Sequence, residues 1–172
     1  MAAAWDEIVQ TLPNGQEIVR IGVRMVTALL IGALIGLQRE LTHHSAGLRT
    51  HMLVALGSAL LVISAAESGM APADVTRIIQ GIVTGIGFLG GGAILKLTSE
   101  REIRGLTTAA GIWMTAAEGV AAGLGRIGTA LLGLAFTLFV LGALAKIEKR
   151  LGHTAMQDAE NKPTAHSSRA DP

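Results

Sequence analysis

Apolar residues gather along the chain in five long stretches that are separated by short polar segments. The stretches are residues 18–37, 52–66, 73–97, 106–124 and 127–145. A helix needs about 20 mostly apolar residues to cross the hydrocarbon core of a bilayer, and the second stretch is short for that length. The pattern predicts an all-α, polytopic membrane protein with about five transmembrane helices.

The same pattern divides the chain into three segments. Residues 1–17 carry acidic side chains where a cleavable signal peptide would need basic ones, so no such peptide is recognised. These residues are expected to form an extracytoplasmic N-terminal segment. Residues 18–150 form the predicted transmembrane domain. Residues 151–172 are polar and include Pro163 and Pro172, which is typical of disorder, and they are expected to be a cytoplasmic tail.

Composition excludes several classes of protein. Charged residues make up 16% of the chain, whereas a soluble domain carries about 25%. Cysteine is absent, which rules out disulfide frameworks, thiolate zinc sites and cysteine catalysis. The net charge of +1 gives no reason to expect nucleic acid as a partner. No catalytic constellation stands out, so we expect a non-enzymatic protein without a cofactor.

Lysine and arginine predict the orientation, because cytoplasmic loops carry an excess of them. If the odd-numbered stretches enter the cytoplasm, eight such residues flank the helices on the inner side and four on the outer side. The inner eight are Arg39, Arg49, Lys96, Arg101, Arg104, Lys146, Lys149 and Arg150. The N-terminus is therefore predicted outside and the C-terminus in the cytoplasm.

Glycine is concentrated in the third stretch, with six glycines between positions 81 and 92. Each costs about 1 kcal/mol relative to alanine in a helix, so the cluster needs a reason. Either the helix breaks near residues 90–92 and lines a polar cavity, or small residues allow close packing; packing is favoured. The candidate positions are Gly85, Gly87, Gly90, Gly91 and Gly92. Leucine at position 85 or 91 is expected to destabilise the fold.

Two other stretches carry small residues at every fourth position. These residues are Gly32 and Gly36 in the first stretch and Gly111, Thr115, Gly119 and Gly123 in the fourth. Faces of this kind let helix backbones approach one another. We interpret them as contact surfaces between helices or subunits.

Three ionisable residues lie within or beside the apolar stretches and are candidate functional intramembrane positions. They are Glu118, Arg24 and Arg77. A charged group at depth in a bilayer normally faces the protein and pairs. At about 1.5 Å per residue, Arg24 and Glu118 come to nearly the same level, which predicts that they pair. Arg77 comes out at the outer interface.

The predicted cytoplasmic loops are dense in polar side chains. The candidate surface residues are Arg39, Glu40, Arg49, Thr50, His51, Arg104, Thr107 and Thr108. Glu40 with His43 or His44 has the donor types of a transition-metal site, while Glu40, Glu100 and Glu102 have the oxygens that Mg²⁺ prefers. An ordinary solvated loop that sets the topology is the alternative, so the metal stays unknown.

A short motif recurs 58 positions apart. Residues 47–50 read Gly-Leu-Arg-Thr and residues 105–108 read Gly-Leu-Thr-Thr, and Gly32 falls on Gly90 at the same offset. The recurrence predicts two hairpins of the same orientation, an arrangement found in transporters. Chance is the alternative, because chains rich in Gly, Ala and Leu align easily.

Four ordered blocks resemble the MgtC/SapB family of bacterial inner-membrane proteins. The blocks are residues 32–40 with Gly-x-x-x-Gly-x-x-Arg-Glu, residues 46–54, residues 85–92, and residues 104–110 together with Trp113. Longer members carry a soluble cytoplasmic regulatory domain. The segment after Lys149 is too short and polar for that domain, so functions that depend on it are not expected.

The resemblance implies a role in magnesium homeostasis at the bacterial inner membrane. A regulator or interaction partner is favoured, and a small oligomeric transporter or channel for an ion such as Mg²⁺ is the alternative. The implied partners are the lipid bilayer and either further copies of the chain or another membrane protein.

Overall fold

The computed structural model describes residues 13–97 and 102–144 of the 172-residue chain. The chain divides into one unit through Thr137 and a second from Leu138, and all contacts below lie within the first. The predicted N-terminal segment and cytoplasmic tail lie largely or wholly outside the described residues.

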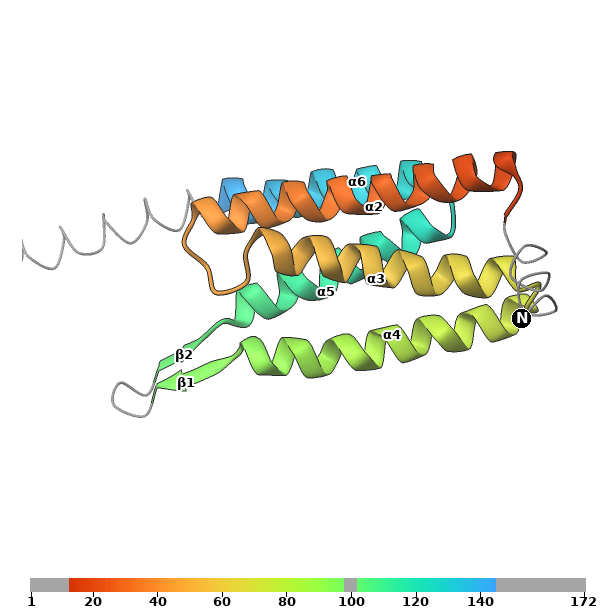
Figure 1. Ribbon diagram of the computed structural model, residues 1–172. Helices are drawn as coiled ribbons and strands as arrows, with labels where there is room; N and C mark the ends of the chain where they lie inside the picture. Colours follow the sequence, from red (N-terminus) through yellow and green to blue (C-terminus); the bar gives the residue numbers. More distant parts are fainter. Residues whose placement is uncertain (1–12, 98–101, 145–172) are drawn as a thin grey trace, which may run out of the picture. The chain divides into compact units, whose positions relative to one another are not determined.

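Each of the five apolar stretches contains a helix, which confirms the helical class. The helices are α2 (Gly15–Leu41), α3 (Leu48–Glu67), α4 (Pro72–Ala93), α5 (Leu106–Gly123) and α6 (Ile127–Phe139), which a π-helix at Val140–Leu144 follows. Two short strands, β1 (Leu95–Leu97) and β2 (Glu102–Arg104), form an antiparallel hairpin between α4 and α5 (Figure 1). This hairpin was not predicted, because residues 95–97 continue the apolar pattern of α4.

The helix break that was the alternative to packing in α4 does not occur, since the helix runs unbroken through residues 90–92 to Ala93. Glycine weakens a helix but keeps its backbone N–H, so it does not remove hydrogen bonds as proline does. Pro72 stands at the start of α4, where a missing N–H costs nothing. Gly105, the N-cap of α5, has φ +94°, a conformation that favours glycine.

Glycine contacts fix how α2, α3 and α5 pack. A Cβ added at Gly32 would lie 2.6 Å from the carbonyl oxygen of His51, and one at Gly123 would lie 2.8 Å from that of Ala59. A Cβ at Gly119 would overlap the carbonyl of Ala55. The predicted faces of small residues are therefore confirmed as contact surfaces between helices. Helix α2 runs antiparallel to α3, and α5 runs parallel to α3 (Figure 1).

The α2–α3 and α4–α5 hairpins make contacts at equivalent positions, in line with the recurring motif, although their connections differ in backbone conformation. Gly47 and Gly105 are the N-caps of α3 and α5. Gly32 packs against His51, and Gly90 packs against Ala109; both members of the second pair lie 58 positions beyond those of the first. The two hairpins run in the same direction (Figure 1).

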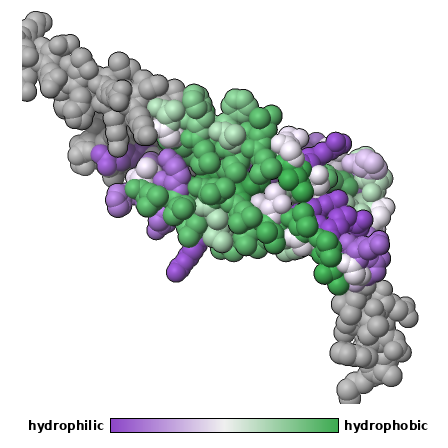
Figure 2. All heavy atoms as spheres, turned by 90° about the horizontal axis from the view of Figure 1, so that it is seen from above, coloured by the Kyte–Doolittle hydropathy of each residue, from purple (hydrophilic) through white to green (hydrophobic). Residues whose placement is uncertain are grey.

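The surface of the bundle is apolar over its middle. Large side chains such as Leu30, Leu53, Phe88 and Phe136 are exposed, and Figure 2 shows an apolar band between hydrophilic ends. Among the described helices, α2 and α3 are long and apolar enough to cross a membrane, and Ile127–Ala143 is a shorter apolar helix. The chain is a membrane protein by these features, while five spans and the orientation stay predictions.

Candidate functional site

Polar side chains are buried in a seam that follows α5 through the bundle. Its members are Arg39, His51, Ser58, Thr108, Thr115, Glu118 and Thr137, which are exposed by 0–7%. A polar group in an apolar interior is costly unless it is hydrogen-bonded. The partners of these side chains therefore show what the seam does.

Arg39 joins the end of α2 to the start of α5. Its Nη2 donates a hydrogen bond of 3.1 Å to Oγ1 of Thr108, and both residues are only 2% exposed. Arg39 lies in the last turn of α2, where a cation is favoured by the carbonyl end of its own helix. The bond connects the first and fourth predicted motif blocks.

His51 lies in the first turns of α3 and is fully buried. Its Nδ1 lies 2.9 Å from the carbonyl oxygen of Gly47, and a carbonyl only accepts, so Nδ1 carries the proton. Nε2 then faces Gly111, where an added Cβ would lie 3.6 Å away. In the described part of the chain, His51 Nε2 and Arg39 Nε have no hydrogen-bond partner.

Glu40 caps α3 across the loop. Its Oε2 accepts a hydrogen bond of 3.0 Å from the backbone N–H of Leu48, and a carboxylate at a helix N-terminus is stabilised by the helix dipole. The carboxylate lies so close to Gly47 that any Cβ there would collide with it. The sequence suggested a metal ligand at this position, and the structure shows a helix cap.

The suggested metal sites find no support in the described residues. His44 Nδ1 lies 2.8 Å from Oγ1 of Thr42, and no group of three His, Asp or Glu side chains comes together within residues 13–97 and 102–144. The side chains of Glu100 and Glu102 lie outside the described residues.

The remaining loop candidates lie at the surface. Arg49, Thr50, Arg104 and Thr107 are exposed, whereas Arg39, His51 and Thr108 are buried together. Sequence reasoning placed all of them on one cytoplasmic surface. The helix periodicity of α5 separates Thr107 from Thr108, because adjacent residues on a helix point about 100° apart.

The predicted pair between Arg24 and Glu118 is wrong. Arg24 donates from Nη1 to the carbonyl oxygen of Gly123 at 3.1 Å, at the C-terminal end of α5, where a cation is favoured. Glu118 accepts a hydrogen bond of 2.7 Å at Oε1 from Oγ1 of Thr137 on α6. Its Oε2 is buried without a partner in the described part of the chain.

The register between α2 and α5 explains this correction. Arg39 meets Thr108, and fifteen residues back along α2 Arg24 meets Gly123, fifteen residues on along α5. Glu118 is therefore level with Leu29 rather than with Arg24. The prediction from the sequence took Gln38 of α2 and Leu106 of α5 to lie at the same depth. In the structure Arg39 is level with Thr108, so the predicted register between the two helices was wrong by about three residues.

Two ion pairs stand at the opposite end of the bundle from Arg39. Arg77 pairs with Asp74 one turn earlier in α4 at 3.0 Å, and this exposed arginine lies near the start of the helix. Its interfacial level stays a prediction. Arg20 pairs with Glu67 at 3.1 Å, which sequence reasoning missed. Thr137 was also missed, although it is one of only two hydroxyl residues on the apolar helix α6.

Of the five candidate glycines in α4, one packs against another described helix. A Cβ added at Gly90 would lie 3.7 Å from that of Ala109, whereas Gly85, Gly87, Gly91 and Gly92 have no described atom within 4 Å. A Cβ at position 85 or 91 therefore has room among the described residues, and the loss of stability expected for leucine there stays a prediction.

The residues of the seam all lie in a part of the chain that matches a known protein family. Residues 25–150 match the sequence profile of the MgtC family, and this range holds every seam residue. The chain belongs to the MgtC family. No solved structure matches it significantly.

Several MgtC-family relatives are similar over most of this chain. SrpB of Synechococcus elongatus is 39% identical over 80% of this chain and 81% of its own length. MgtC of Brucella abortus is 42% identical over 80% of this chain but 56% of its own length. YhiD of Escherichia coli K12, which is named as a candidate magnesium transporter, is 39% identical over 75% of this chain and 62% of its own length. The chain thus spans little more than half the length of the Brucella MgtC.

Proposed function

We propose that this MgtC-family chain is a multi-pass protein of the bacterial inner membrane that serves magnesium homeostasis as a regulator, through contact with other membrane proteins. Family membership and the name of YhiD support the link to magnesium. Extended apolar helices with exposed leucine, valine and phenylalanine side chains support the membrane location.

The close packing around the buried polar seam favours a regulatory role over ion conduction. Glycines bring α2 and α5 into backbone contact with α3, so these three helices leave no width between them for a hydrated ion. Arg39 and Glu118 are hydrogen-bonded to threonines and are 2% and 3% exposed. A side chain that guides an ion through a membrane protein faces a water-filled cavity.

Glu118 supports a second candidate function, a small oligomeric transporter. Its carboxyl group lies in the middle of an apolar helix with Oε2 unused by the described residues. Carboxyl groups in this setting serve as ion or proton carriers in transporters. An oligomer could place a second copy against α6 and open a path there.

Ion flux separates the two candidates. Purified protein in sealed vesicles with a Mg²⁺ gradient is expected to show no flux above empty vesicles, read with a Mg²⁺-sensitive dye. Saturable flux that is lost in Glu118→Gln and kept in Glu67→Gln, which changes an acid at the end of α3, would establish transport instead. A regulator should also retain a defined membrane protein in pull-downs from native membranes.

Cysteine labelling tests the orientation. With five spans and the N-terminus outside, a cysteine at Ser68 in intact cells reacts with a membrane-impermeant maleimide, and one at Ser45 reacts only after the membrane is opened. Both serines are exposed, Ser45 in the loop between α2 and α3 and Ser68 at the end of α3. The reverse pattern would invert the topology, and labelling of both sites in intact cells would exclude the span between them.

A further inference from the structure

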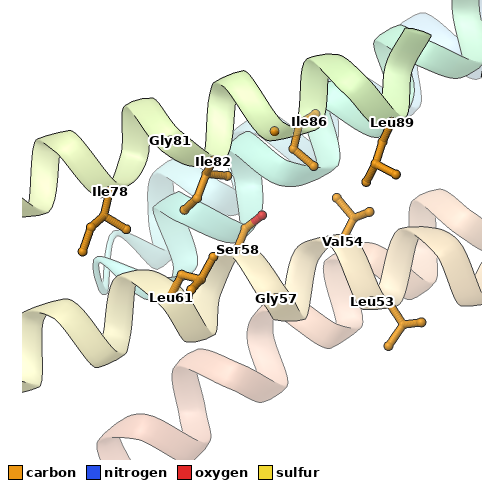
Figure 3. Close-up of a pocket in the computed structure, with 11 residues that line it drawn as sticks. Leu53, Val54, Gly57, Ser58, Leu61, Ile78, Gly81, Ile82, Ile86 and Leu89 are labelled. Carbon is orange, nitrogen blue, oxygen red and sulfur yellow. The ribbon is translucent and has the colours of Figure 1, made fainter. Parts of the chain in front are cut away.

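A furrow runs along the surface between α3 and α4. Its main part has a volume of about 560 Å³, and Val54, Ser58 and Leu61 of α3 face Ile78 and Ile82 of α4 across it (Figure 3). A second hollow of about 400 Å³ continues it toward the start of α3. Leu89 lines both parts, so they adjoin.

Glycines keep this furrow open. Gly57, Gly81 and Gly85 line its main part, and a Cβ added at any of them would have no described atom within 4 Å. Two of these glycines are in α4, where the chain itself gives them no packing role. Glycine in a helix is less stable than alanine. The two α4 glycines are explained if a molecule other than this chain occupies the space beside them.

Polarity changes along the furrow. The lining is apolar from Leu61 to Leu89 apart from Ser58, whose hydroxyl can donate to a carbonyl of its own helix. The other end is also mostly apolar, but its lining includes two hydroxyl residues, Ser45 and Thr50. Arg49 lines neither hollow, but it is exposed next to Thr50, one turn before the lining residue Leu53, and forms no ion pair with a described residue.

The two ends of the furrow therefore differ in charge. At the Ile78 end, the nearby arginines Arg20 and Arg77 are paired with carboxylates. At the Thr50 end, Arg49 is an exposed cation, and the carboxylate of Glu40 is engaged by the backbone of α3. An amphipathic anion placed along the furrow would have its charged group at the Thr50 end.

We propose that the furrow binds one acyl chain of an anionic phospholipid, with the lipid phosphate at Arg49 and Thr50. The twelve residues from Thr50 to Leu61 cover about 17 Å along α3, close to the roughly 15 Å depth of one leaflet's hydrocarbon. A helix of that length, about 10 Å wide, would occupy roughly 1,300 Å³, which is more than the two parts of the furrow hold together at about 560 and 400 Å³. An extended acyl chain fits this space better.

The inference is independent of whether the protein regulates or transports, because Ser58 is the one seam residue that lines the furrow. The lipid is assigned to the leaflet at the Arg49 end because Arg49 is an exposed cation, whereas Arg20 and Arg77 at the other end are paired with carboxylates. A guanidinium and a hydroxyl at a helix start are suitable donors to a phosphate group.

Native mass spectrometry of the purified protein tests the proposal with phosphatidylglycerol and phosphatidylcholine. Wild type should retain one phosphatidylglycerol per chain, in preference to phosphatidylcholine. Gly85→Leu fills the furrow and should weaken retention at least tenfold, while Gly87→Leu makes the same substitution two residues away, outside the lining, and should not. Melting curves of both variants confirm that they fold.

Arg49 supplies the second arm of the test. Arg49→Gln should remove the preference for phosphatidylglycerol, and Arg126→Gln, at the far end of α5, should leave it unchanged. Equal lipid retention by wild type and Gly85→Leu would overturn the proposal. So would a wild-type oligomer that Gly85→Leu converts to monomer without changing lipid retention, because the furrow would then hold a second copy of the chain.

Discussion

Alanine at position 119 is expected to destabilise the chain by about 3 kcal/mol, the upper part of the usual cost of overpacking. The added methyl group would overlap the carbonyl of Ala55 on α3. Backbone atoms cannot rotate away as a side chain can, so α5 would have to move off α3. That movement would also disturb the hydrogen bond between Arg39 at the end of α2 and Thr108 at the start of α5.

Gly91→Ala is the matched control for this prediction. Position 91 is helical and has no described atom within 4 Å, so alanine there should leave stability unchanged or raise it by up to about 1 kcal/mol through helix propensity. Thermal or denaturant unfolding in one detergent compares the two variants. Equal unfolding curves would show that the α3–α5 contact does not constrain the fold.

Valine at position 108 is expected to cost about 2 kcal/mol, because hydrogen bonds to charged groups contribute about 1.5–3 kcal/mol. Valine keeps the shape of threonine and removes the acceptor for Arg39 Nη2. The buried guanidinium would then lose its described side-chain partner. Unfolding measurements against wild type give the cost.

Thr107→Val makes the same change on the exposed side of the same turn and should shift stability by less than about 0.5 kcal/mol. A double-mutant cycle with Arg39→Met completes the test. If Thr108→Val costs as much in the Arg39→Met background as in wild type, the loss does not come from the bond between the two side chains.

The chemistry of the buried seam was only partly predictable from the sequence. Arg39, His51 and Thr108 were recognised as candidates, but as members of one exposed loop surface together with Arg49 and Thr107. The sequence shows that these residues share one end of the bundle. It does not show which of them turn inward, because that depends on how α2 and α5 are rotated against each other.

The metal expectation failed for a related reason. Glu40, His43 and His44 are close in sequence and have suitable donor atoms, but the backbone N–H of Leu48 at the start of α3 takes the Glu40 carboxylate. Such competition between a ligand role and a helix cap is settled by loop geometry. The positive φ of His43, 57°, is part of that geometry and has no clear sequence signal.

The sequence by itself determined the helical class, the membrane environment, the existence of five helices and the glycine faces of α2 and α5. These features depend on local composition and periodicity, which act within one helix. Only the tertiary structure decided that Arg24 meets Gly123 instead of Glu118, that Glu118 meets Thr137, and that most α4 glycines face open space. These outcomes depend on the register and rotation between helices, which backbone contacts at Gly32, Gly119 and Gly123 fix across long distances in the sequence.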